Sequence, residues 1–145
     1  MDVASRSVQD FFDQYAHSRS AMDIDRLTSQ YADLCMLAGP DGAQVAEKQA
    51  LLEGFPKALG LLKTVGHTST TLASLDETRV DEHYAMVRAQ FVWRFERATA
   101  PPMDVTVDST FILYIKDGVP KIVFHHEHED FWQALRTRGV LPAQE

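Results

Sequence analysis

The segment His83–Arg97, "HYAMVRAQFVWRFER", decides the fold because its side chains alternate with a period of two. One set is apolar throughout and comprises Ala85, Val87, Ala89, Phe91, Trp93 and Phe95. The other set is mixed and includes Arg88, Gln90, Arg94 and Glu96. Successive side chains of a β-strand point to opposite faces, so this segment predicts a long strand with one face in a core.

Further strand patterns flank this segment. Thr64–Asp76, "TVGHTSTTLASLD", is rich in β-branched residues, and Val105–Gly118, "VTVDSTFILYIKDG", again alternates. Asp117-Gly118 is typical of a tight hairpin turn and leads into Pro120–Glu129, "PKIVFHHEHE". The second half of the chain therefore predicts an antiparallel meander.

Helical spacing dominates the first sixty residues. Apolar residues recur three and four positions apart at Val8, Phe11, Phe12 and Tyr15. A second helix is predicted from "DIDRLTSQYA", residues 23–32, with Asp23 as its N-cap and Ile24, Leu27 and Tyr31 on its buried side.

A short apolar strand, "DLCMLAG", follows and ends at the turn Gly39–Gly42. Residues 43–63 then predict a third helix, in which Pro56 should produce a kink or a break. The segment 129–142, "EDFWQALRTRGVLP", predicts a last short helix that Gly139 and Pro142 stop.

These elements predict one α+β domain over residues 1–145. Its sheet should be antiparallel, curved and cone-shaped, with the N-terminal helices over the concave face. The chain has 145 residues, 45% hydrophobic residues and one cysteine, Cys35, which excludes an internal disulfide. Its net charge of −7 argues against nucleic acid as a partner, and no apolar run is long enough for a membrane span. We expect a cytoplasmic protein.

Four segments resemble the nuclear transport factor 2-like superfamily, in particular its SnoaL-like branch. They are residues 8–33, the turn 39–42, residues 66–76 ("GHTSTTLASLD") and residues 117–132 ("DGVPKIVFHHEHEDFW"). The resemblance spans about residues 5–138 and implies a cone fold with an internal pocket. Members of this superfamily include isomerases, dehydratases, polyketide cyclases, ligand-binding subunits and transport adaptors, so a shared fold does not imply one activity.

The resemblance carries over few functional residues. Tyr15 matches the first-helix tyrosine of ketosteroid-isomerase-like members, but Gly39 occupies the place of their general-base carboxylate. Phe111 and Ile112 fall where their partner acid would lie, which argues against steroid isomerisation. His67 resembles the acid–base histidine of scytalone-dehydratase-like members. The superfamily also implies a homodimer through the sheet, and the mixed face of the sheet is apolar enough for one.

The stretch "KIVFHHEHED", residues 121–130, holds three of the six histidines. Unbroken alternation after Ile122 and Phe124 would point His126 into the pocket and His128 toward its rim. We therefore expect His126, His67 and Tyr15 to be catalytic. The expected ligand-binding residues are Tyr31, Phe91, Trp93, Phe111, Phe124 and His128.

A metal site is the alternative interpretation of this stretch. His126 and His128 could supply two ligands from one strand, with Glu96 or Asp108 as further ligands. Acid–base chemistry is favoured, so we expect no metal and no cofactor. The predicted function is proton transfer on a small apolar carbonyl or hydroxyl compound by a lyase, isomerase or cyclase. The alternative is a non-catalytic ligand-binding or assembly subunit.

Overall fold

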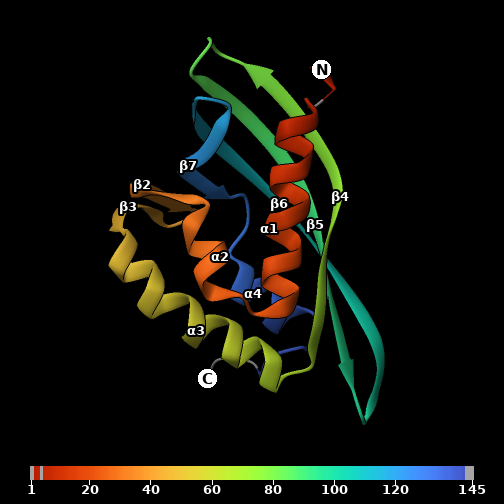
Figure 1. The fold of residues 1–145 in the computed structure, drawn as a ribbon. Helices are drawn as coiled ribbons and strands as arrows, with labels where there is room; N and C mark the ends of the chain where they lie inside the picture. The colour runs from red at the N-terminus through yellow and green to blue at the C-terminus, as the bar shows by residue number, and fades with distance from the viewer. Residues whose placement is uncertain (1, 4, 143–145) are drawn as a thin grey trace.

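The computed structural model describes residues 2–3 and 5–142 and has one curved, seven-stranded sheet (Figure 1). The strand order is β1-β4-β5-β6-β7-β2-β3, and every neighbouring pair is antiparallel except β2 and β7. The strands are β1 Asp2–Val3, β2 Tyr31–Gly39, β3 Gly42–Glu47, β4 His67–Arg79, β5 Tyr84–Arg97, β6 Ala100–Lys116 and β7 Val119–Glu127. The helices are α1 Arg6–Ala21, α2 Ile24–Ser29, α3 Lys48–Thr64 and α4 Phe131–Thr137.

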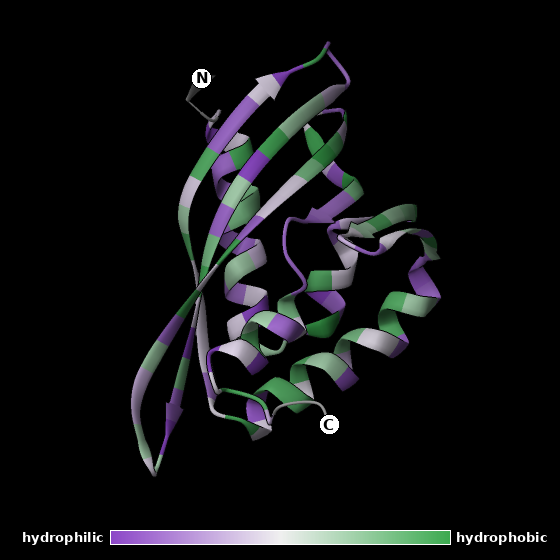
Figure 2. Cartoon of the chain, turned by 180° about the vertical axis from the view of Figure 1, so that it is seen from behind, coloured by the Kyte–Doolittle hydropathy of each residue, from purple (hydrophilic) through white to green (hydrophobic). Residues whose placement is uncertain are grey.

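The alternation that predicted β5 is confirmed. All six apolar residues of its inner set are buried, whereas Met86 and Arg88 on the other face are exposed. On β6, Val105, Val107 and Phe111 continue the same buried layer. The helices lie over the concave side of the sheet, and Figure 2 shows the same arrangement from behind. The α+β cone is therefore the observed fold.

Helix α1 fills the middle of the cone with aromatic rings. The Phe12 ring lies 4.8 Å from that of Phe111, and the Tyr15 ring lies 5.3 Å from that of Phe91, measured between centroids. Burying such side chains removes a large apolar area from water and stabilises the fold by about 25 cal/mol per Å². The apolar stripe of α1 thus packs against the inner layer of β5 and β6.

One hairpin turn and two helix caps have the geometry that their residue types favour. Asp117 and Gly118 have positive φ values of 52° and 77°, as a two-residue hairpin loop requires. The Asp23 side chain accepts a hydrogen bond from the backbone N–H of Arg26, and Asp130 accepts one from Gln133 at the start of α4. Both aspartates therefore act as helix N-caps.

Three local predictions need correction. Residues 43–47 form strand β3 rather than helix, because Gly42–Glu47 pairs with Leu34–Gly39 across the turn. Tyr31 begins strand β2 rather than continuing α2. Of the kink or break predicted at Pro56, only the break is contradicted, because α3 runs from Lys48 to Thr64 with Pro56 inside it.

Within the part of the chain that the structure describes, no helix has the length and apolar character needed to cross a membrane.

Candidate functional site

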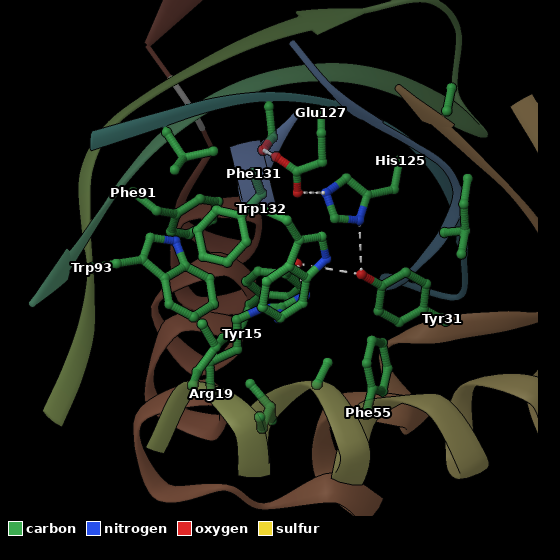
Figure 3. A pocket seen from close by; sticks show the side chains of 17 residues that line it. Tyr15, Arg19, Tyr31, Phe55, Phe91, Trp93, His125, Glu127, Phe131 and Trp132 are labelled. Atoms are coloured by element: carbon green, nitrogen blue, oxygen red, sulfur yellow. Dashed lines mark hydrogen bonds and ion pairs between the residues drawn. The ribbon is translucent and has the colours of Figure 1, made fainter. Parts of the chain in front are cut away.

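A cavity of about 280 Å³ lies between the concave face of the sheet and the helices (Figure 3). Its 17 lining residues come from α1, β2, α3, β5, β6, β7 and α4. Most of the wall is apolar or aromatic, and the predicted ligand-binding residues Tyr31, Phe91 and Trp93 are part of it, together with Tyr15. Such a wall with a few convergent polar groups is typical of a small-molecule site.

The polar groups of the cavity form a continuous chain of contacts (Figure 3). Oη of Tyr15 lies 3.3 Å from Oη of Tyr31, and Oη of Tyr31 lies 2.9 Å from Nδ1 of His125. Nε2 of His125 lies 2.8 Å from Oε1 of Glu127, a close but bent contact because the oxygen lies off the N–H direction. Ser109 donates a hydrogen bond of 2.9 Å to the other carboxylate oxygen of Glu127. Two phenols, an imidazole and a carboxylate therefore form one network.

Arg19 extends this network on the α1 side. It lies one helical turn after Tyr15, and its Nη2 donates a hydrogen bond of 2.6 Å to Oη of Tyr15. Because Oη of Tyr15 accepts from the arginine, the hydroxyl hydrogen of Tyr15 is free to point toward Tyr31 or toward a bound molecule.

The surroundings shift the pKa values of Tyr15, Tyr31 and Glu127. Burial raises the pKa of Tyr15 and of Tyr31, so both phenols are protonated at neutral pH. Burial also opposes ionisation of Glu127, but His125, Arg19 and Ser109 outweigh it and lower the pKa of this carboxyl. The site thus holds an ionised carboxylate next to an imidazole.

The orientation of His125 depends on an irregularity in β7. Leu113 of β6 pairs with Ile122, but the neighbouring Ile112 pairs with Phe124, so Val123 is an extra residue. A β-bulge of this kind reverses which side chains face inward after it. His125 is therefore buried, and its ring stacks on Phe111 with a centroid distance of 4.3 Å.

The same bulge makes the predicted orientation of His126 wrong. Because Val123 shifts the alternation by one residue, His126, His128 and Phe124 share the outer face of the sheet and do not line the cavity. The rings of His126 and His128 lie 4.8 Å apart there, and Nε2 of His128 lies 2.6 Å from Oγ1 of Thr110.

Two other predicted residues lie behind the cavity wall rather than in it. His67 is buried, contacts Oγ1 of Thr70 at 2.8 Å and packs against Trp93 with a ring distance of 4.9 Å. Phe111 is fully buried beneath His125. Neither residue lines the cavity, so each supports a lining side chain instead.

The sequence reasoning missed Arg19, His125, Glu127 and Ser109. A signal existed for Arg19, because positions four apart share a helix face and Tyr15 was already a candidate. No such signal existed for His125 and Glu127, because unbroken alternation along the strand places both on the outer face. No pattern in the sequence marked the bulge that turns both side chains inward.

A groove adjoins the cavity. Glu127, Phe131 and Trp132 line both the cavity and an adjoining groove, which the turn between β2 and β3 borders. Across residues 2–3 and 5–142, no three His, Cys, Asp or Glu side chains lie together as a metal site would require.

Comparison by structure finds many proteins of similar architecture. Aln2 from a Streptomyces species has a TM-score of 0.73 at 14% identity and covers 94% of this chain and 100% of its own. A nuclear transport factor 2-like protein with a cystatin-like fold from Novosphingobium aromaticivorans has a TM-score of 0.71 at 12% identity, with 94% and 88% covered. The chain has the nuclear transport factor 2-like fold.

Other proteins with the nuclear transport factor 2-like fold carry functional names. A protein from Novosphingobium aromaticivorans that is provisionally named a scytalone dehydratase has a TM-score of 0.67 at 13% identity, with 84% of this chain and 80% of its own covered. By sequence, no protein-family model and no curated protein matches the chain. Identities this low establish the fold alone.

Proposed function

We propose that this chain binds a small, largely apolar carbonyl or hydroxyl compound in the cone and transfers protons on it without a cofactor. One observation carries the proposal: His125 lies between the ionised carboxylate of Glu127 and the hydroxyl of Tyr31, at 2.8 and 2.9 Å. A base held between a carboxylate and a hydroxyl is a recurring arrangement for acid–base chemistry.

The proton path begins at Tyr31. In its neutral form with hydrogen on Nε2, His125 accepts the Tyr31 hydroxyl hydrogen at Nδ1. When His125 takes that proton, Glu127 stabilises the imidazolium, and Oη of Tyr31 can accept a proton from a substrate carbon. The proton then returns along the same path to another carbon in an isomerisation, or to a departing hydroxyl group in a dehydration.

Tyr15 supplies the electrophilic group. Because Arg19 donates to its oxygen, the hydroxyl hydrogen of Tyr15 is available, and its contact with Tyr31 is long at 3.3 Å. That hydrogen can turn to a substrate carbonyl oxygen and stabilise the negative charge that develops there. Aromatic walls that exclude water would strengthen this interaction. The dehydratase name of one protein of the same fold agrees with a lyase reaction.

The test uses two neighbouring histidines as a matched pair. A panel of small hydroxy ketones and enolisable ketones is screened for turnover with the wild type, His125→Ala and His126→Ala. We expect His125→Ala to lower kcat/KM by about 10²–10⁴-fold, the usual contribution of a placed proton-transfer group. His126→Ala should retain the wild-type rate because His126 lies on the outer face.

Two outcomes would contradict the proposal. Full-rate turnover by His125→Ala would remove the imidazole from the mechanism. Tight binding of panel compounds by the wild type without any turnover would instead identify a ligand-binding subunit, the second class of function for this cavity.

A further inference from the structure

Arg19 has a buried N–H group that no described residue satisfies. Its Nη2 donates to Tyr15, but its Nε is buried and has no acceptor within residues 2–3 and 5–142. Among the same residues, Arg19 also forms no ion pair with a carboxylate. An unpaired buried donor is costly, and more so on a charged group, so this position is suited to an acceptor from outside the chain.

Aromatic rings hold the guanidinium in place without using its N–H groups. Cζ of Arg19 lies 4.7 Å from the ring centre of Tyr15, 5.5 Å from that of Trp93 and 5.6 Å from that of Phe55. The face of an aromatic ring attracts the charge but accepts no in-plane hydrogen bond. Among the described residues, Tyr15 is therefore the only hydrogen-bond acceptor of the guanidinium.

In the described part of the chain, no carboxylate in contact with Arg19 neutralises its charge. Burial opposes this charge, but the oxygens of Tyr15 and Tyr31 and the more distant Glu127 outweigh it, so the pKa of Arg19 is raised. Both oxygens of Glu127 are already engaged, one by His125 and one by Ser109. The cavity thus contains a fixed cation whose direct partner is a neutral phenol.

We propose that the ligand of this cavity is a monocarboxylate with an aromatic or alicyclic body, and that Arg19 binds its carboxylate. This inference rests on the proposed function and names its substrate class. Guanidinium groups match carboxylates in shape and can donate two parallel hydrogen bonds. The apolar body would lie against Trp93 and Phe91, with its reactive carbon toward Tyr31.

The cavity has room for a ligand with one ring. An apolar cavity of about 150 Å³ is enough to bind benzene, so about 280 Å³ admits a single aromatic ring with one carboxylate. A phosphate ester is disfavoured because the described lining residues offer no second arginine or lysine for its second charge and include the carboxylate of Glu127.

The experiment compares benzoate with benzamide, which has nearly the same shape and no charge. Binding to the wild type is measured by calorimetry and by fluorescence of Trp93 and Trp132, which both line the cavity. We expect benzoate to bind about 10- to 100-fold more tightly at about pH 7.5, the range for hydrogen bonds to a charged group.

Three variants locate the effect. Arg19→Gln should abolish the preference for benzoate while leaving the affinity for benzamide within about threefold of the wild type. Arg19→Lys keeps the charge and should keep part of the preference. Arg94→Gln removes an equal charge from the outer face, where Arg94 pairs with Asp104, and should change nothing.

Several results would overturn the inference. The first is that the wild type binds benzoate and benzamide with equal affinity, and the second is that it binds neither compound. The third is that Arg94→Gln loses as much of the preference for benzoate as Arg19→Gln does. If Arg19→Gln does not fold, the inference remains testable, because the wild-type comparison can still overturn it and Arg19→Lys still probes the position. Failure of the proposed function would be distinguishable. If the wild type prefers benzoate but His125→Ala turns over the ketone panel at the full rate, the catalytic role of His125 is wrong and the carboxylate site at Arg19 remains.

Discussion

Oη of Tyr31 lies 2.9 Å from Nδ1 of His125, and both residues are buried in the wall of the cavity. Tyr31 opens strand β2, and His125 lies on β7, the parallel neighbour of β2 in the sheet. This contact links the phenols on one side of the site to the imidazole and carboxylate on the other.

Removing the Tyr31 hydroxyl should therefore lower stability. Tyr31→Phe keeps the ring but leaves Nδ1 of His125 without its partner, and an unsatisfied buried group costs about 1–3 kcal/mol. Urea unfolding measures the loss. Tyr84→Phe is the control, because Tyr84 is 40% exposed. The free energy of unfolding of this variant should stay within about 0.5 kcal/mol of the wild-type value. Equal values for both variants would show that the contact contributes nothing.

The pH dependence of stability should report His67. Burial lowers the pKa of this histidine below its ordinary value of 6.5, and the charge of Arg19 lowers it further. In the unfolded chain His67 takes up a proton as the pH falls below about 6.5, while in the folded chain it remains neutral until a lower pH. The unfolded state then binds more protons, so stability falls on acidification from about pH 6.5 to the folded pKa.

His67→Gln should flatten this part of the stability curve, whereas His17→Gln, at an exposed position on α1, should not. His128, whose pKa is also lowered, acts in the same direction. Denaturant unfolding at half-unit steps of pH measures both variants. An unchanged slope in His67→Gln would assign the acid sensitivity to other groups.

Gly66, between α3 and β4, should not tolerate a side chain. Its φ is +102°, and an added Cβ would lie 2.6 Å from the backbone oxygen of Glu96 and 2.9 Å from Cγ of Arg97. We expect Gly66→Ala to lower the free energy of unfolding by about 2 kcal/mol or more. Gly54→Ala is the opposite case, because Gly54 is exposed inside α3 with nothing within 4 Å, and it should gain about 0.5–1 kcal/mol. Thermal melting of the two variants should therefore shift in opposite directions.

The outer face of the sheet carries an apolar row across four strands. Met86 of β5 pairs with Ile112 of β6, and Ile112 pairs with Phe124 of β7. Phe124 in turn pairs with Met36 of β2. Arg88 and Asp108 lie on the same face with opposite charges, so a second copy related by a twofold axis could match both the row and the charges. We propose that the chain forms a homodimer through this row.

Light scattering tests the homodimer. The wild type should have the mass of a dimer at micromolar concentration, and Met86→Glu should have the mass of a monomer, because it buries a charge in the interface. Val80→Glu is the control, since Val80 is 65% exposed, directly follows β4 and lies outside the row. A monomeric wild type would exclude the homodimer.

The sequence by itself determined the architecture of this protein. The strict alternation in β5 predicts a long strand with one buried face. The apolar stripe of α1 predicts a helix that packs against an apolar surface. The Asp117-Gly118 turn and the Asp23 and Asp130 caps are equally local, because each depends on the conformational preference of one or two residues.

Only the tertiary structure decided which histidine faces the cavity. The bulge at Val123 arises from how β7 pairs with β6, and a shift of one residue exchanges the faces of every later side chain. The assembly of Tyr31, His125 and Arg19 around one space likewise depends on contacts between distant segments. Periodicity describes a side chain relative to its own strand or helix, so it predicts a face but not the neighbours that the folded chain brings to it.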